Sequence, residues 1–211
     1  LTFSDGSIIN NAQTYYFKVE PIKWRILKEN GNKVLIFCES ILANKGYGNS
    51  SSNNYAQSQI RTWLNNEFYN IAFSELQKSL MTITELDNSA YSTGYDSNPY
   101  ACEDTNDKIF LLSYREATNI DYGFNNDGDF NDLERRKIAS DYSRATGAWV
   151  NDSGYGVWWL RSPDDWYDAC SRDVGNLGKS GVVGVDISGV SYHGLVPAIT
   201  ILLEPCVHDF N

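Results

Sequence analysis

The sequence predicts a single α+β domain, and three observations lead to that fold class. Strand-forming segments occur at both ends of the chain, a helical period occurs in the middle, and 42% of the 211 residues are hydrophobic. The 6 Trp, 14 Tyr and 9 Phe supply much of the apolar surface that a chain of this size buries. We therefore expect one domain over residues 1–211, with its core between about residues 15 and 203.

The first part of the chain predicts antiparallel β-structure. Three strands are expected, at Tyr15–Glu20, Ile22–Lys28 and Lys33–Cys38. The Glu29-Asn-Gly-Asn32 segment joins the last two, and Asn-Gly between apolar runs is a strong hairpin signal. Cys38 ends an apolar run and is expected to be a small core residue.

Helices are expected in the middle of the chain, after a polar stretch over residues 44–54. Ile60, Trp63, Leu64 and Phe68 have the i, i+3, i+4, i+8 spacing of one buried helix face. Ser74 with Gln77, and later Ser113 with Glu116, have the spacing of a capping box, so each pair predicts the start of a short helix.

Short strands dominate the predicted second half, apart from a polar loop over Asp121–Asp132. The expected strands are Lys108–Leu112, Val157–Arg161, Val182–Val185 and Leu195–Leu203. Across the whole chain, the residues expected in the core are Trp24, Ile60, Trp63, Leu64, Phe68, Phe110, Leu111 and Leu160.

The charge excludes some classes of partner. The net charge is −10, so a nucleic-acid backbone or an anionic lipid surface would be repelled. Residues 1–83 carry 8 Lys/Arg and 6 Asp/Glu, whereas residues 84–211 carry 9 and 21. The longest apolar runs are far shorter than the roughly 18 residues of a membrane helix, so no insertion into a bilayer is expected.

The spacing of the cysteines and histidines gives little support for a metal site. Cys38, Cys102, Cys170 and Cys206 are far apart, and only His193 and His208 could join them, so no transition-metal site is expected. Their disulfide state is left open. Calcium is the remaining metal, through Asp127, Asp129 and Asp132 with Asn125, Asn126 and Asn131, but the spacing differs from an EF-hand and solvation of a surface loop is favoured.

No catalytic residue is predicted. Ser162 and Cys170 are the candidate nucleophiles, but each would need a histidine base brought to it by folding, and no known nucleophile signature surrounds either residue. Whether the protein is an enzyme stays open at this stage, with binding favoured over catalysis.

A binding surface is the better-supported hypothesis. The segment between Arg161 and Gly194 mixes aromatic side chains with short polar ones, and Tyr and Trp give large contact areas at a low cost in rotamer entropy. The predicted ligand-binding residues are Asp164, Asp165, Trp166, Tyr167, Asp168, Ser171, Arg172, Asp173, Asn176, Ser188, Ser191, Tyr192 and His193. Trp166, Tyr167 and Tyr192 should then be exposed, and Trp158 or Trp159 buried. The alternative is an exposed rim that binds nothing.

Several sequence blocks resemble a family of uncharacterised bacterial domains that is common in gut Firmicutes. The most specific block is Trp158-Trp-Leu-Arg-Ser-Pro163, and further blocks in the same order include Ile22-Lys-Trp-Arg-Ile-Leu27 and Ser58-Gln-Ile-Arg-Thr-Trp-Leu-Asn65. The likeness runs from about Tyr15 to Leu203. One departure is Val196 in the closing block Gly194-Leu-Val-Pro-Ala198, where the family usually has arginine.

The resemblance implies a C-type lectin-like fold and a relation to variable proteins diversified by retroelements. In those proteins the exposed, ligand-binding residues lie between the two motifs, which corresponds here to Asp164–His193. It therefore implies a domain on the bacterial cell surface, or outside the cell, that binds a protein or carbohydrate on another surface. Two alternatives remain open: an oxidoreductase similar to formylglycine-generating enzymes, which a reactive Cys170 would favour, and a structural spacer within a larger surface protein.

Overall fold

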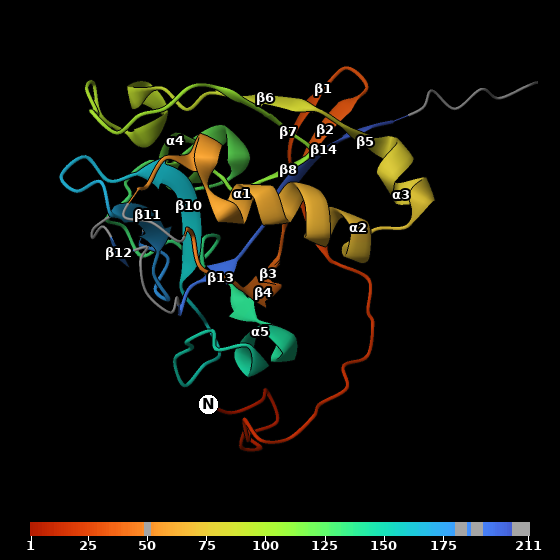
Figure 1. Cartoon of the computed structure of the whole chain (residues 1–211). Helices are drawn as coiled ribbons and strands as arrows, with labels where there is room; N and C mark the ends of the chain where they lie inside the picture. Colours follow the sequence, from red (N-terminus) through yellow and green to blue (C-terminus); the bar gives the residue numbers. More distant parts are fainter. Residues whose placement is uncertain (49–51, 180–184, 187–191, 204–211) are drawn as a thin grey trace, which may run out of the picture.

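In the part of the chain that the structure describes, the main elements are two five-stranded sheets and a row of short helices (Figure 1). The structure, a computed structural model, describes residues 1–48, 52–179, 185–186 and 192–203. It confirms the predicted α+β class, with many antiparallel strands and few short helices.

The first sheet joins the two ends of the domain. Its order is β1-β2-β14-β5, and β8 also pairs with β14. The strands are β1 (Trp24–Asn30), β2 (Lys33–Cys38), β5 (Met81–Thr82), β8 (Ile109–Phe110) and β14 (Ala198–Leu202). The predicted hairpin is present as β1 and β2, and β14 lies antiparallel beside it with Ile199 opposite Ile36.

The second sheet has the order β12-β11-β10-β13-β4. Its strands are β4 (Ala43–Asn44), β10 (Trp158–Pro163), β11 (Cys170–Val174), β12 (Val185–Asp186) and β13 (Gly194–Leu195). Two minor sheets pair β3 (Ser40–Ile41) with β9 (Ile138–Ala139) and β6 (Thr84–Leu86) with β7 (Thr105–Asp107). Of the predicted strand Val182–Val185, residues 182–184 lie outside the described residues.

The helices begin where the polar residues of the sequence cap them. Ser58 accepts a hydrogen bond from the Arg61 N–H at the start of α1, and both predicted capping boxes are formed, at Ser74 and at Ser113. The α-helices are α1 (Gln59–Trp63), α2 (Tyr69–Ala72), α3 (Glu75–Leu80), α4 (Tyr114–Ala117) and α5 (Asp141–Ala145). A π-helical turn, η2 (Leu64–Phe68), joins α1 to α2, and the 3₁₀ turns are η1 (Tyr55–Gln57), η3 (Ala90–Thr93) and η4 (Ile120–Tyr122).

The core contains most of the residues that the sequence assigns to it. Cys38 and the predicted core residues Ile60, Leu64, Phe110, Leu111 and Leu160 are buried. Three predicted members, Trp24, Trp63 and Phe68, are instead half-buried and pack against the core from its edge. Their rings form a chain of contacts through Phe73, with ring centroids 5.3 to 6.3 Å apart.

The first predicted strand is wrong. Residues 15–20 have strand-forming side chains but no regular secondary structure, and the first strand begins at Trp24. Among the described residues β1 pairs with β2 alone, so residues 15–20 have no neighbouring strand with which to form a ladder. Residues 14–22, which we call the N-terminal arm, instead run along the outside of the domain from the region of α5 to β1 (Figure 1).

The Trp-Trp-Leu-Arg-Ser-Pro block is an interior strand. All six residues of β10 are buried, and both indole N–H groups donate to backbone carbonyls, of Arg135 and of Lys45, at 3.0 Å. Arg161 pairs with Glu116 and donates to the Leu111 carbonyl at 2.8 Å. The block therefore fixes the ends of β10, and the loop that follows it, relative to the core.

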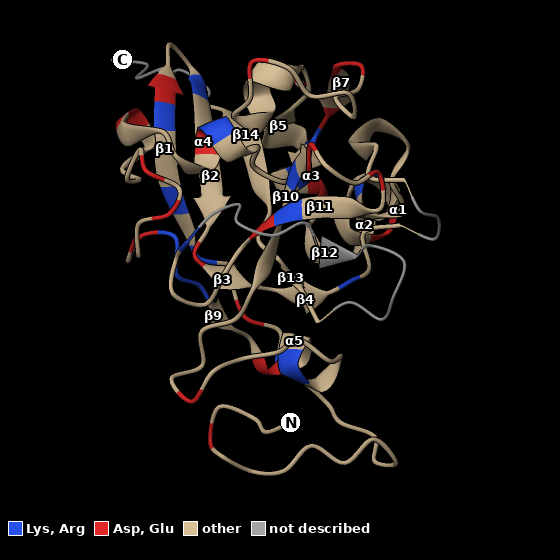
Figure 2. Cartoon of the chain, turned by 90° about the vertical axis from the view of Figure 1, so that its left-hand side faces the viewer, with Lys and Arg blue, Asp and Glu red and all other residues tan. Residues whose placement is uncertain are grey.

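Charged residues are unevenly distributed over the fold. In Figure 2, blue bands of Lys and Arg mark β1 and β11, whereas much of the red of Asp and Glu lies on loops. None of the helices in the described ranges is long and apolar enough to cross a bilayer.

Candidate functional site

The connection between β10 and β11 forms an exposed loop with both aromatic and acidic side chains. This aromatic–acidic loop comprises residues 164–169. Trp166 is 75% exposed and Tyr167 is 63% exposed, while Trp158 and Trp159 on the adjoining strand have no exposed surface. These exposures confirm the pattern predicted from the sequence. Asp168 is exposed and Asp164 and Asp165 are half-buried, so carboxylates flank the two rings.

Asn53 holds the loop backbone in place. Its side-chain amide donates to the carbonyls of Cys170 at 2.7 Å and Tyr167 at 3.0 Å, and its backbone N–H donates to the Asp168 carbonyl at 2.6 Å. Asn53 itself is buried. Because Asn53 donates hydrogen bonds to the loop carbonyls, Trp166 and Tyr167 extend from an ordered backbone.

Arg172 lies behind the loop, between two tyrosine rings. Its guanidinium carbon is 4.3 Å from the ring centroid of Tyr95 and 4.3 Å from that of Tyr114, and the residue is only 5% exposed. Its Nε atom has no hydrogen-bond partner among the described residues. Arg172 is thus a positioned cation beneath the acidic loop and contributes little exposed surface of its own.

Burial and the charge of Arg172 beside the loop both affect the pKa values of the neighbouring Tyr95 and Asp164. Burial raises the pKa of Tyr95; the positive charge of Arg172 opposes the shift and a hydrogen bond to Asp165 adds to it. Burial also raises the pKa of Asp164, opposed by a backbone hydrogen bond and by Arg172. Arg172 thus offsets only part of the effect of burial, and the pKa of Asp164 stays above its ordinary value.

The predicted binding residues divide into separate groups. Ser171 is fully buried, and its hydroxyl bonds to the carbonyls of Leu160 and Ser162, so it supports the strand and offers no surface to a ligand. Asn176 is half-buried in the turn that follows β11. Ser188 and Ser191 lie outside the described residues.

Tyr192, His193 and Asp173 lie toward the opposite end of β10 from the aromatic–acidic loop. Trp158 at the start of β10 is opposite Gly194 and Val174, whereas Pro163 at its end is opposite Ser171. His193 Nε2 lies 2.7 Å from Asp173 Oδ2, and the imidazole stacks on the buried Trp159 ring with centroids 4.1 Å apart. Tyr192 is 64% exposed, as predicted, but it precedes Gly194, which pairs with the start of β10, whereas Trp166 follows the end of that strand.

The candidate nucleophiles lie in structural positions. The Ser162 hydroxyl is buried and accepts a hydrogen bond from the Tyr114 N–H at 2.9 Å. Burial raises the pKa of the Cys38 thiol to about 11 and raises that of Cys102, the opposite of the shift that activates a cysteine. Cys170 is half-buried on β11, and Cys206 lies outside the described residues.

The loop considered for calcium surrounds an arginine. The Arg135 guanidinium donates to the carbonyls of Asn125 at 2.7 Å, Asp127 at 2.9 Å and Phe130 at 2.9 Å. The Asp132 carboxylate accepts the N–H groups of Asn125 and Glu134. Within the described ranges, no group of three or more His, Cys, Asp or Glu side chains is arranged to hold a metal ion.

Comparison with known families places the chain among domains whose activity is undefined. Residues 31–202 match the family described as Domain of unknown function (DUF6273). The chain belongs to this family. The DUF6273 match includes β10, the aromatic–acidic loop and Asn53, and it excludes residues 1–30. Neither the curated proteins nor the solved structures contain a match to the chain.

Sequence reasoning missed the residues that position the site. Asn53, Tyr95 and Tyr114 reach the loop or Arg172 across long separations in sequence. Asn53 lies within the polar stretch over residues 44–54, where nothing local distinguishes it from Asn54. Only the three-dimensional structure, or covariation between distant positions, identifies such partners.

Proposed function

We propose that this domain is a recognition module, displayed on a bacterial cell surface, that binds a protein or glycan partner through the aromatic–acidic loop. The observation that carries the proposal is the pair Trp166 and Tyr167, which are 75% and 63% exposed on a loop whose backbone is held by Asn53. Exposed aromatic rings on a preorganised backbone give binding energy without a large entropic cost.

The neighbouring side chains favour particular partner groups. Asp164, Asp165 and Asp168 provide hydrogen-bond acceptors next to the rings, and the cation of this region, Arg172, is buried. Such a surface suits hydroxyl groups of a glycan stacked on Trp166, or the cationic side chains of a protein partner. It would repel an anionic partner.

The test begins with two probe sets, a glycan array and a library of displayed peptides. For each ligand that binds, the dissociation constant is compared for the native domain, Trp166→Ala, Tyr167→Ala and a control, Ile71→Ala. Ile71 is as exposed as Trp166 but lies on α2. We expect the loop variants to weaken binding by more than about 1 kcal/mol and the control to have no effect.

Stability and salt dependence complete the experiment. Trp166→Ala should change the free energy of unfolding by less than about 0.5 kcal/mol, as at an ordinary surface site. Affinity for a cationic peptide should fall with added salt, whereas affinity for a neutral glycan should not. Ligands that bind both loop variants as well as the native domain would show that the loop is not the binding surface.

We also propose a C-type lectin-like fold and a relation to retroelement-diversified variable proteins. The support is the motif resemblance, together with the exposure of Trp166 and Tyr167 between the two motifs. Sequencing the neighbouring genomic DNA tests the relation. A reverse-transcriptase gene and a near-copy of the segment encoding residues 164–193 are expected, and their absence would count against diversification.

A further inference from the structure

The N-terminal arm, residues 14–22, is an extended segment that lacks a backbone partner. Among the described residues, no backbone–backbone hydrogen bond involves residues 14–22. Tyr16 is 94% exposed and Val19 is 95% exposed. The segment has the composition of a strand, which is why the sequence predicts one there. Its backbone N–H and C=O groups are therefore available to pair with those of another chain.

The arm is held at its two ends. Phe3 contacts Tyr15 and Phe17, and Phe17 contacts Tyr142, all edge to face with ring centroids 4.9 to 6.2 Å apart. At the other end the Lys23 carbonyl accepts the Glu39 N–H at 3.0 Å. The extended conformation is thus fixed before any partner arrives, which lowers the entropic cost of pairing.

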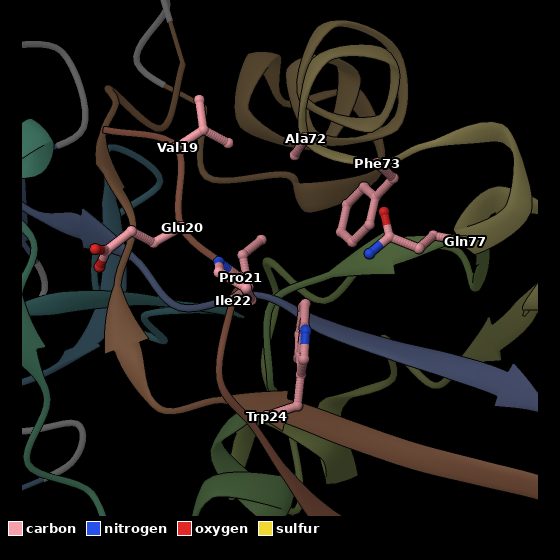
Figure 3. A pocket seen from close by; sticks show the side chains of 8 residues that line it. All are labelled: Val19, Glu20, Pro21, Ile22, Trp24, Ala72, Phe73 and Gln77. Carbon is pink, nitrogen blue, oxygen red and sulfur yellow. The ribbon is translucent and has the colours of Figure 1, made fainter. Parts of the chain in front are cut away.

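Open space borders the arm. One cleft of about 430 Å³ separates Val19–Ile22 from Trp24 and from Ala72, Phe73 and Gln77 (Figure 3). A second cleft of about 520 Å³ separates Phe17, Lys18 and residues 20–23 from Ser40, Leu42 and the start of α5. These openings leave the arm accessible to a second chain.

We propose that two copies of this chain associate by antiparallel pairing of their N-terminal arms, with Val19 opposite Val19. In this register Lys18 lies opposite Glu20 of the other copy, twice by symmetry, and Tyr16 lies opposite Ile22. Opposite charges and aromatic–aliphatic pairs are the favourable cross-strand combinations. The interface is isologous, as expected for a two-fold dimer.

Pro21 is compatible with this register. In an antiparallel ladder, hydrogen-bonded and non-hydrogen-bonded pairs alternate. If Val19 forms a non-hydrogen-bonded pair, Lys18 and Glu20 exchange hydrogen bonds, and Pro21 falls at a position that needs no N–H. Pairing of Lys18 with Lys18, one residue away in register, would place like charges opposite each other. The charge pattern of the arm thus selects a second copy and a single register.

Charge reversal tests the register without touching the core. Lys18 and Glu20 are exposed and form a 3.0 Å ion pair within the chain. The native protein should be a dimer by sedimentation equilibrium at high concentration. Lys18→Glu alone, or Glu20→Lys alone, should weaken the dimer by roughly 10- to 100-fold, because each creates two like-charge pairs.

Two combinations distinguish this register from other modes of association. The double variant with both reversals should recover the native dissociation constant. An equimolar mixture of the two single variants should form the heterodimer in preference to either homodimer. A native protein that stays monomeric, single variants that dimerise like the native protein, or a mixture without heterodimer would each overturn the proposal. Circular dichroism and thermal unfolding confirm that every variant is folded.

Discussion

Lys137 is a lysine whose ammonium group lies inside the protein. The residue is 1% exposed, its Nζ atom lies 3.5 Å from Glu39 Oε2, and it sits 4.6 Å from the centroid of the Phe37 ring. Burial lowers the pKa of Lys137 from 10.5 to about 8, partly opposed by the charge of Glu39. The charged lysine is therefore a cost to the folded state at neutral pH.

Replacing this lysine should stabilise the protein at neutral pH. Between about pH 8 and pH 10.5 the unfolded state binds more protons at Lys137 than the folded state, so its contribution to the free energy of unfolding rises with pH. Below about pH 8 the penalty is complete, at roughly 3 kcal/mol. Lys137→Met should remove it, since Glu39 keeps Arg25 as an ion-pair partner at 3.2 Å.

The measurement is urea unfolding of the native protein and Lys137→Met at a series of pH values. The variant should be more stable near neutral pH, and the difference should shrink toward zero by about pH 10. Burial raises the pKa of tyrosines such as Tyr122 above the ordinary value of about 10 that they have in the unfolded state, so they also make stability depend on pH; taking the difference between the two proteins cancels this contribution. A difference that is constant with pH would show that packing, and not charge burial, determines the outcome.

Arg135 organises the loop that precedes it. Its guanidinium bonds to backbone carbonyls within residues 125–130 and also to the carbonyl of Gly178 at 2.6 Å. Arg135→Met should leave these carbonyls without donors and cost about 3 to 5 kcal/mol of stability. The neighbouring Arg136 is the control, because it is only half-buried and its Nε–H donates to the Leu177 carbonyl at 3.2 Å in an exposed hydrogen bond. Chemical denaturation of Arg136→Met should show a change below about 0.5 kcal/mol.

Among the helices and strands, the sequence predicts correctly those whose stabilising contacts join residues that are close in the chain. Both capping boxes join residues three positions apart, and both are formed. The β1–β2 hairpin is likewise local. The strand expected over residues 15–20 failed because strand propensity describes the side chains and does not supply a neighbouring strand. The residues that position the candidate site could not be predicted either, because their partners are distant in the sequence. Asn53, for example, donates to carbonyls more than 100 residues away.

The helix from α1 to α2 depends on its buried face. Leu64, at the start of the π-helical turn, is fully buried in the core. Leu64→Ala should reduce the free energy of unfolding by about 2 to 5 kcal/mol, because it leaves a cavity. Leu76→Ala, on the exposed face of α3, should change it by less than about 0.5 kcal/mol. Equal denaturation midpoints for the two variants would contradict the assigned helix face.

Order in the aromatic–acidic loop should depend on Asn53. Asn53→Ala removes the amide that donates to the carbonyls of Tyr167 and Cys170 and should cost about 1 to 3 kcal/mol. Hydrogen exchange within residues 164–169 should accelerate while exchange in β14 is unchanged. Asn66→Ala is the control, since its side chain also donates to a carbonyl but is exposed on a helix. Unchanged exchange in the loop would show that Asn53 does not order it.

For the whole molecule, the sheet that joins its two ends should be the most stable unit. β14 lies between β2 on one side and β5 and β8 on the other. Its amides and those of β2 should exchange only through global unfolding, whereas amides of residues 14–22 should exchange fastest. Mass spectrometry at low protein concentration tests this order. Protection of the arm under those conditions would mean that it has an intramolecular partner.

Arg135 also affects how the 125–130 segment responds to the ions around the domain. Many acidic loops outside cells are ordered by ions taken from the medium, and they loosen when a chelator or dilution removes those ions. The 125–130 segment folds around a positive charge that is covalently part of the chain. Because that charge cannot dissociate, we expect a chelator to leave the conformation of this segment unchanged.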